Sequence, residues 1–173
     1  MLSAMTLEDR VRHPDTGADL GIVVRIKGLM EVISTAGGTV RCRITENFDP
    51  LSAGDLVMTA SLRNAPVFDA WVKPDRVIRG TILARNEPIL SIHPSDILYI
   101  DKGADDGVRP GDRFVMYSRN EDAKTGGFRE PLGEIEAVNV MKSETAVLVV
   151  SLRDRPVGVG DRAELTARCR IVE

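Results

Sequence analysis

The stretch from Tyr99 to Tyr117, YIDKGADDGVRPGDRFVMY, constrains the fold of this chain most strongly. Two short apolar runs flank a loop that holds three glycines and four aspartates. Glycine permits backbone angles that other residues resist, and aspartate and proline are typical of tight turns. The stretch therefore predicts two β-strands joined by a shaped turn.

Similar runs recur along the rest of the chain, and they predict an all-β fold class. The runs are short, rich in β-branched residues and bounded by glycine, proline or aspartate. The first 59 residues have no apolar stripe with helical spacing. Strands are expected at residues 20–26, 29–34, 40–45, 77–84, 132–140 and 145–150.

An internal repeat indicates how these strands are organised. A Thr-Gly turn, a Leu-Gly pair, a hairpin and a Gly-Asp turn follow one another in the same order in both halves of the chain. The landmarks are Thr16-Gly17, Leu20-Gly21 and Gly54-Asp55 in the first half, and Thr125-Gly126, Leu132-Gly133 and Gly160-Asp161 in the second.

The two copies differ in extent, and this difference sets the expected domains. Only the second copy is preceded by a further strand and by the Tyr99–Tyr117 loop. We therefore expect a partial β unit over residues 1–59, an apolar linker over residues 60–75 and a complete β-barrel domain over residues 76–173. The partial unit predicts either a chain cut from a longer protein, or a half-unit that completes itself. It would do so against the full unit, or against a second chain in a homo-oligomer that forms through exposed strand edges.

Composition excludes several classes of protein. The net charge of −3 gives no basic surface for nucleic acid, and 43% hydrophobic residues are typical of a globular protein with a core. No apolar run is long enough to span a bilayer, and the N-terminal residues lack the pattern of a signal peptide. Cys42 and Cys169 allow at most one disulfide and have no metal-site spacing, and Cys42 is expected to be buried as a small hydrophobic residue.

Phe68 and Trp71 are the candidate partner-binding residues of the linker. Rings of this size are costly to leave in water. Either they pack between the two halves, or they form an exposed site that binds a partner.

The four loop aspartates are weak candidates for a calcium site. Counted from Asp101, an EF-hand loop needs an oxygen ligand at its third position, glycine at its sixth and glutamate at its twelfth. The chain has Gly103, Asp106 and Asp112 at these positions, so the motif fails at each, and no metal or cofactor is expected. A looser calcium site would use all four aspartates, Asp101, Asp105, Asp106 and Asp112.

No motif predicts an enzyme. Asp15-Thr16-Gly17-Ala18 matches the signature of retroviral-type aspartic proteases, which need two such aspartates that share a proton. The second copy has Ala123-Lys124-Thr125-Gly126 instead, without aspartate. His13 and His93 each precede proline, no serine lies in a nucleophile-elbow motif, and there is no phosphate-binding glycine loop.

One family resemblance covers residues 76–166 and, as a partial second copy, residues 13–59. It rests on short turn motifs: Ile100-Asp101-Lys102-Gly103, Asp106-Gly107-Val108, Gly111-Asp112-Arg113-Phe114, Thr125-Gly126, Leu132-Gly133 and Gly160-Asp161-Arg162. They resemble the C-terminal domain of bacterial flagellar assembly protein T and similar C-terminal regions of LysM-containing envelope proteins. The resemblance implies an SH3-like barrel without catalysis, in an exported protein that is periplasmic or associated with the outer membrane. This chain has neither a LysM module nor a signal peptide.

Together these observations predict a non-enzymatic cell-envelope scaffold or assembly module that binds protein partners. By the resemblance, the partners are envelope or flagellar basal-body proteins, and the chain is a fragment of a longer exported protein. The alternative is a module that contacts peptidoglycan or another carbohydrate, although aromatic rings make up only 4% of the chain. An aspartic-type protease is the third reading.

Overall fold

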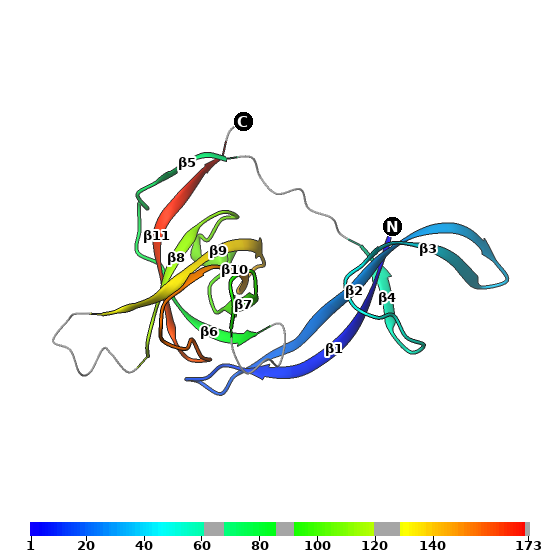
Figure 1. Ribbon diagram of the computed structural model, residues 1–173, viewed down its shortest axis with the longest axis horizontal. Helices are drawn as coiled ribbons and strands as arrows, with labels where there is room; N and C mark the ends of the chain where they lie inside the picture. The colour runs from blue at the N-terminus through cyan, green and yellow to red at the C-terminus, as the bar shows by residue number, and fades with distance from the viewer. Residues whose placement is uncertain (61–67, 86–91, 120–128, 172–173) are drawn as a thin grey trace. The chain divides into compact units, whose positions relative to one another are not determined.

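A computed structural model of the chain describes residues 1–60, 68–85, 92–119 and 129–171 (Figure 1). These residues form β-strands and one short 3₁₀ helix, with no α-helix among them, so the predicted all-β class is confirmed. Within the described ranges, no helix has the length and apolar character needed to cross a membrane. The elements are β1 (Leu2–Arg12), β2 (Asp19–Ala36), β3 (Thr39–Asn47), β4 (Leu56–Thr59), β5 (Phe68–Val72), β6 (Arg79–Arg85), β7 (Ile97–Ile100), η1 (Ala104–Asp106), β8 (Arg113–Tyr117), β9 (Pro131–Val140), β10 (Thr145–Leu152) and β11 (Arg162–Ile171).

The chain divides into two compact units. Residues 1–11 and 20–64 form the first, here called the open-sheet unit, and residues 12–19 and 65–173 form the second, here called the barrel unit. The turn at residues 12–19 thus groups with the barrel unit, and the segment expected to be a linker contains β5.

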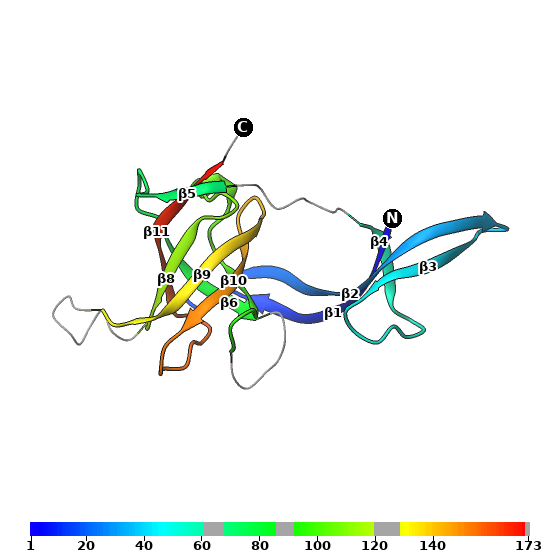
Figure 2. The ribbon, with the colours of Figure 1, turned by 45° about the horizontal axis from the view of Figure 1, so that its top comes forward.

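The barrel unit is a closed antiparallel barrel with one additional strand (Figure 2). Its six strands follow the order β11-β6-β7-β10-β9-β8, and β8 pairs back onto β11, with Phe114 opposite Leu165. β5 pairs with the end of β11, where Trp71 lies opposite Cys169. Closure satisfies the backbone groups that an open sheet leaves at its edges.

A continuous apolar core fills the barrel. In β8, Phe114 and Met116 are fully buried, while the residues between and beside them are partly exposed, as the two-residue period of a strand requires. Each such side chain stabilises the fold by about 1.5–3 kcal/mol. The core comprises Ile78, Ile82, Leu98, Ile100, Val108, Phe114, Met116, Leu132, Ile135, Ala137, Val147, Val149, Val157, Ala163 and Leu165.

The open-sheet unit is a four-stranded sheet in the order β3-β2-β1-β4. The sequence did not predict β1, because its apolar residues do not alternate, and the strand forms by pairing with β4 and β2. β2 is one strand of 18 residues where two were expected. Cys42 is partly exposed on β3, so the expectation that it is buried was wrong, and neither Cys42 nor Cys169 forms a disulfide.

Burial differs sharply between the two units. Thirteen of the nineteen large hydrophobic side chains that are exposed in the described residues belong to the open-sheet unit. The buried residues of this unit are few: Ser3, Ala4, Met5, Val23, Lys27 and Gly28. The barrel therefore has its own core, whereas the sheet leaves most of its apolar side chains in solvent.

Candidate functional site

A four-residue turn that ends in aspartate precedes four of the strands, namely β4, β7, β8 and β11. In each turn the third residue has a φ between 79° and 101°, and the aspartate side chain accepts a hydrogen bond from the first residue's N–H at 2.7–3.0 Å. The aspartates therefore stabilise turns. The turns are Ser52–Asp55, His93–Asp96, Arg109–Asp112 and Gly158–Asp161.

The candidate metal ligands mostly serve the same purpose. Asp106 accepts a hydrogen bond from the N–H of Gly103 at 3.0 Å, and Asp101 accepts one from the N–H of Thr81 at 2.6 Å. Asp105 lies in η1. Across the described part of the chain, no three or more His, Cys, Asp or Glu side chains are grouped so that they could hold a metal ion.

Asp112 also belongs to a buried ion pair that holds the Tyr99–Tyr117 loop against β11. Nη2 of Arg168 lies 3.4 Å from Oδ2 of Asp112 and donates to the carbonyl of Gly107 at 2.9 Å, while Nη1 donates to Asp75 at 2.7 Å. Burial raises the pKa of the Asp112 carboxyl, although the Arg109 N–H and the Arg168 guanidinium oppose this shift. The loop is thus anchored by Arg168, which lies in the last strand of the chain, β11.

The predicted partner-binding residues lie on β5. The ring of Trp71 is 44% exposed, the Arg113 guanidinium lies 3.9 Å from its centroid, and its Nε1 donates to the carbonyl of Gly111 at 3.3 Å. These contacts are all within the barrel unit. Phe68 lies opposite Ile171 in the sheet, and its side chain is outside the described residues. Partner binding by the two residues stays a prediction.

Asp15, the candidate protease residue, lies among arginines. It accepts a hydrogen bond from Arg162 at 2.6 Å, and Arg119 lies 3.7 Å away. The hydrogen bond from Arg162 holds the pKa of Asp15 below its usual value. An aspartic-protease dyad needs two carboxyl groups that share a proton.

The neighbouring His13 has both ring nitrogens engaged. Its Nδ1 accepts hydrogen bonds from the N–H groups of Asp15 and Thr16, at 3.1 and 3.3 Å. Its Nε2 lies 3.1 Å from Oδ2 of Asp101, which fits a ring that carries its proton on Nε2. The residue thus shapes a turn.

A hollow on the barrel surface, about 390 Å³ in volume, has walls of mixed charge. Glu164 accepts hydrogen bonds there from Arg79 at 2.9 Å and from Arg129 at 2.7 Å. Burial alone would raise the pKa of Glu164, but the two arginines outweigh it and the pKa is lowered. The charges in this hollow largely satisfy one another. Its lining residues are Arg79, Gly80, Thr81, Arg129, Arg162, Ala163 and Glu164.

The feature that stands out is one face of the open sheet. Successive side chains of a strand point to opposite faces, so Ile22, Val24 and Ile26 share a face of β2, and Arg25 lies on the other. Arg25 donates to Glu8 of β1 at 2.9 Å, which places Leu7 on the face of Ile22.

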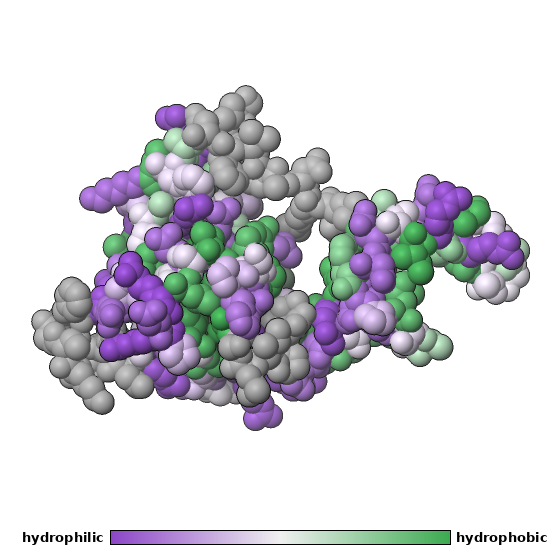
Figure 3. Space-filling model, viewed as in Figure 1, coloured by the Kyte–Doolittle hydropathy of each residue, from purple (hydrophilic) through white to green (hydrophobic). Residues whose placement is uncertain are grey.

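The pairing of the other strands extends this surface. Met5, next on the same side of β1 as Leu7, lies opposite Leu56 of β4, and Ser3 lies opposite Met58. β3 is the other neighbour of β2. Val32 is an even number of residues from Ile26, so it points to the same face, and it pairs with Cys42 of β3. Figure 3 shows hydrophobic atoms exposed over this unit. We call this surface the apolar face, with exposed residues Leu7, Ile22, Val24, Ile26, Val32, Ile44, Leu56 and Met58.

The opposite face of the sheet carries internally paired charges, together with the apolar residues Ala4, Val23 and Val57. Lys27 is buried and binds Asp55 at 2.8 Å, and Arg25 binds Glu8 and Asp49 at 2.8 and 3.4 Å. Asp49 and Asp55 come from the connection between β3 and β4, so this connection covers this opposite face. The hydrogen bond from Lys27 lowers the pKa of Asp55. On the apolar face, Leu7, Ile22, Val24 and Ile26 are exposed, whereas Ser3 and Met5 beside β4 are buried.

The apolar face was not predicted from the sequence, because Ile22, Val23 and Val24 are consecutive apolar residues and do not show which side of β2 faces solvent. Only Val23 of these three is buried. One signal could have identified the face. From Ile22 to Val32, every second residue of β2 is apolar or glycine, while the alternate positions include Arg25, Lys27 and Glu31.

The fold and this surface define an all-β protein in which a closed barrel is joined to an open sheet with one apolar face.

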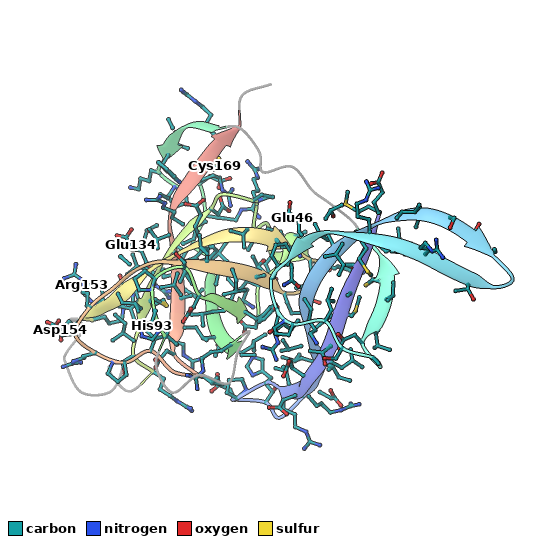
Figure 4. All side chains as sticks on the ribbon, turned by 45° about the vertical axis from the view of Figure 1, so that its right-hand side comes forward. Glu46, His93, Glu134, Arg153, Asp154 and Cys169 are labelled. Carbon is teal, nitrogen blue, oxygen red and sulfur yellow. The ribbon has the colours of Figure 1, made fainter. Side chains whose placement is uncertain are left out.

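Cys169, the buried cysteine, lies on β11 where β5 pairs with it (Figure 4). Comparisons with protein-family models, with curated proteins and with solved structures find no match.

Proposed function

We propose that this chain is a non-enzymatic assembly module that binds protein through the apolar face of its open sheet. The observation that carries the proposal is the exposure of eight large hydrophobic side chains, each 37–54% exposed, on a single side of one sheet. Contiguous apolar surface of this kind marks interaction sites in soluble proteins, whereas scattered exposed hydrophobic residues do not.

The free energy available from burying these side chains favours a partner that covers most of the apolar face. Complete burial of a large aliphatic side chain is worth about 1.5–3 kcal/mol, so half-exposed side chains offer roughly half of that each. Eight of them offer about 6–12 kcal/mol in total, against an association cost on the order of 4–15 kcal/mol. A partner that covers only a few of these side chains would not bind measurably.

The engagement of the polar side chains supports a scaffold over a catalyst. The aspartates of the four turns, the Asp112–Arg168 pair and the Glu164 cluster each form hydrogen bonds within the protein. In the Asp112–Arg168 pair, Oδ1 of Asp112 and Nε of Arg168 are buried without a hydrogen-bond partner, so neither atom faces solvent. A catalytic acid or base must instead reach a substrate proton.

The cell-envelope setting of the proposal rests on the family resemblance of the turn motifs. It implies envelope or flagellar basal-body proteins as partners. Fractionation of cells that express the natural gene tests this point. Recovery in the periplasm or the outer membrane is expected, and recovery only in the cytoplasm would contradict the setting without affecting the apolar face.

The experiment that tests the binding role uses two matched variants. Val24→Asp places a carboxylate on the apolar face, and Val138→Asp places one on β9, at a side chain of similar exposure on the barrel. Tagged wild-type and variant chains are cross-linked in cells and purified. The proposal expects Val24→Asp to lose protein partners, including other copies of the chain, that wild type and Val138→Asp retain. Equal retention by all three would refute it.

A further inference from the structure

We infer that the occupant of the apolar face is a second copy of this chain, so that two open sheets stack face to face in a two-fold symmetric dimer. The inference rests on the proposed function of the face and names its partner. It concerns the open-sheet unit and makes no use of the barrel.

The chemistry of β2 favours a copy of itself over an unlike partner. Along the apolar face, six successive positions of this strand have no charged or polar side chain: Ile22, Val24, Ile26, Gly28, Met30 and Val32. Asp9, which follows Leu7 on the same side of β1, lies beside this stripe. The stripe itself has no charge with which to select a partner by charge complementarity. A two-fold axis brings the same patch of both copies together, so an apolar stripe meets an apolar stripe.

The area available agrees with a weak homodimer. Each of the eight side chains offers roughly 60–120 Å² when fully exposed, hence about 250–500 Å² for the half-exposed set. Interfaces are a little over half apolar, so two copies would bury about 900–1,700 Å² in total. Specific interfaces begin near 1,200 Å², which places this dimer at the small end and its Kd in about the micromolar range.

Stacking of the two sheets would cover the face, and pairing at strand edges would not. Sheets that pack face to face lie about 10 Å apart with their side chains interdigitated. Edge pairing through β4, which has four residues, or through β3 would leave Ile22, Val24 and Ile26 in solvent. The dimer is therefore a sandwich of two four-stranded sheets.

Sedimentation velocity on the purified full chain, from about 5 to 500 μM, tests this inference. Wild type is expected to change from monomer to dimer across this range. Val24→Asp and Ile26→Asp should each raise the dimer Kd by about 100-fold, because two unpaired carboxylates would be buried in every dimer. Val138→Asp should dimerise like wild type, and circular dichroism should show that all variants are folded.

Two outcomes would overturn the inference, a wild-type chain that stays monomeric and a dimer that the face variants leave intact. A wild-type chain that stays monomeric at 500 μM has no second copy on its apolar face. If wild type is monomeric but Val24→Asp loses a different protein in the cross-linking experiment, the occupant of the face is that protein and the proposed binding function stands. If wild type is monomeric and Val24→Asp loses no protein, the dimer and the proposed binding function are both refuted. A dimer that both face variants leave intact uses another surface.

Discussion

Gly21 and Gly133 occupy matching positions in the two halves of the chain and both have positive φ, 119° and 156°, but only Gly133 is tightly packed. A Cβ on Gly133 would collide with the carbonyl oxygen of Ser151 across β9 and β10, whereas a Cβ on Gly21 would meet no atom within 4 Å. The same Leu-Gly landmark thus lies in a closed barrel in one half and in an open sheet in the other.

We therefore expect alanine to have unequal effects at these two glycines. Gly133→Ala combines backbone strain with a clash that forces β9 and β10 apart, at a cost of roughly 3 kcal/mol or more. Gly21→Ala adds only the strain, at about 1 kcal/mol. Urea denaturation followed by circular dichroism measures both. Equal costs would show that the two positions are packed alike.

Ser95 adopts a φ of 79° in the His93–Asp96 turn, where the three corresponding turns have glycine. Ser95→Gly should stabilise the protein by about 1 kcal/mol, because glycine removes the strain of the left-handed backbone. Ser151→Gly, in the extended strand β10, should instead destabilise it by about 0.5–1 kcal/mol. Thermal unfolding of the two variants should shift in opposite directions. A loss of stability on Ser95→Gly would contradict this account of the turn.

Removing the buried arginine should weaken the attachment of the turn residues Gly107 and Asp112 to β11, although β8 stays paired with β11 through the backbone. Arg168→Met leaves the carboxylate of Asp112 buried without its ion-pair partner, so a loss of about 3 kcal/mol is expected. Arg76→Met is the matched control, because this side chain is more than half exposed and its ion pair with Asp75 spans 4.0 Å. Chemical denaturation should separate the two variants, and similar losses would mean that the buried pair does not anchor the loop.

The cluster at Glu164 should contribute to acid sensitivity. The pKa of Glu164 in the folded protein lies below its usual value of 4.5, so between the two values the unfolded chain binds more protons than the folded one. The stability that Glu164 contributes is present above pH 4.5 and is lost as the pH falls through the lowered pKa. Glu164→Gln should therefore flatten the dependence of unfolding free energy on pH between about 5 and 3. An unchanged slope in that variant would exclude this role.

Local turn chemistry was predictable from the sequence because its signals lie within four residues. Gly111-Asp112 and Gly160-Asp161 indicated turns before strands, and both turns have that geometry. His93-Pro94 also indicated a turn, but the sequence did not group it with the Gly-Asp turns, because Ser95 stands where the other three turns have glycine.

The features that depend on distant pairing were not predictable. Closure of the barrel joins β8 to β11 across two intervening strands, and nothing in either strand specifies the other. β5 forms in a segment with two prolines because the end of β11 offers it an edge. Which face of β2 is covered depends on the ion pair between Lys27 and Asp55, which lie 28 residues apart.

A dilution series followed by NMR of isoleucine methyl groups in the full chain tests directly whether the apolar face binds a second copy. The methyls of Ile22, Ile26 and Ile44 on the apolar face should change chemical shift between about 500 and 10 μM, as the dimer dissociates. The methyls of Ile82 and Ile135, fully buried in the barrel, should not move. Constant shifts for all three face residues across the series would contradict the account.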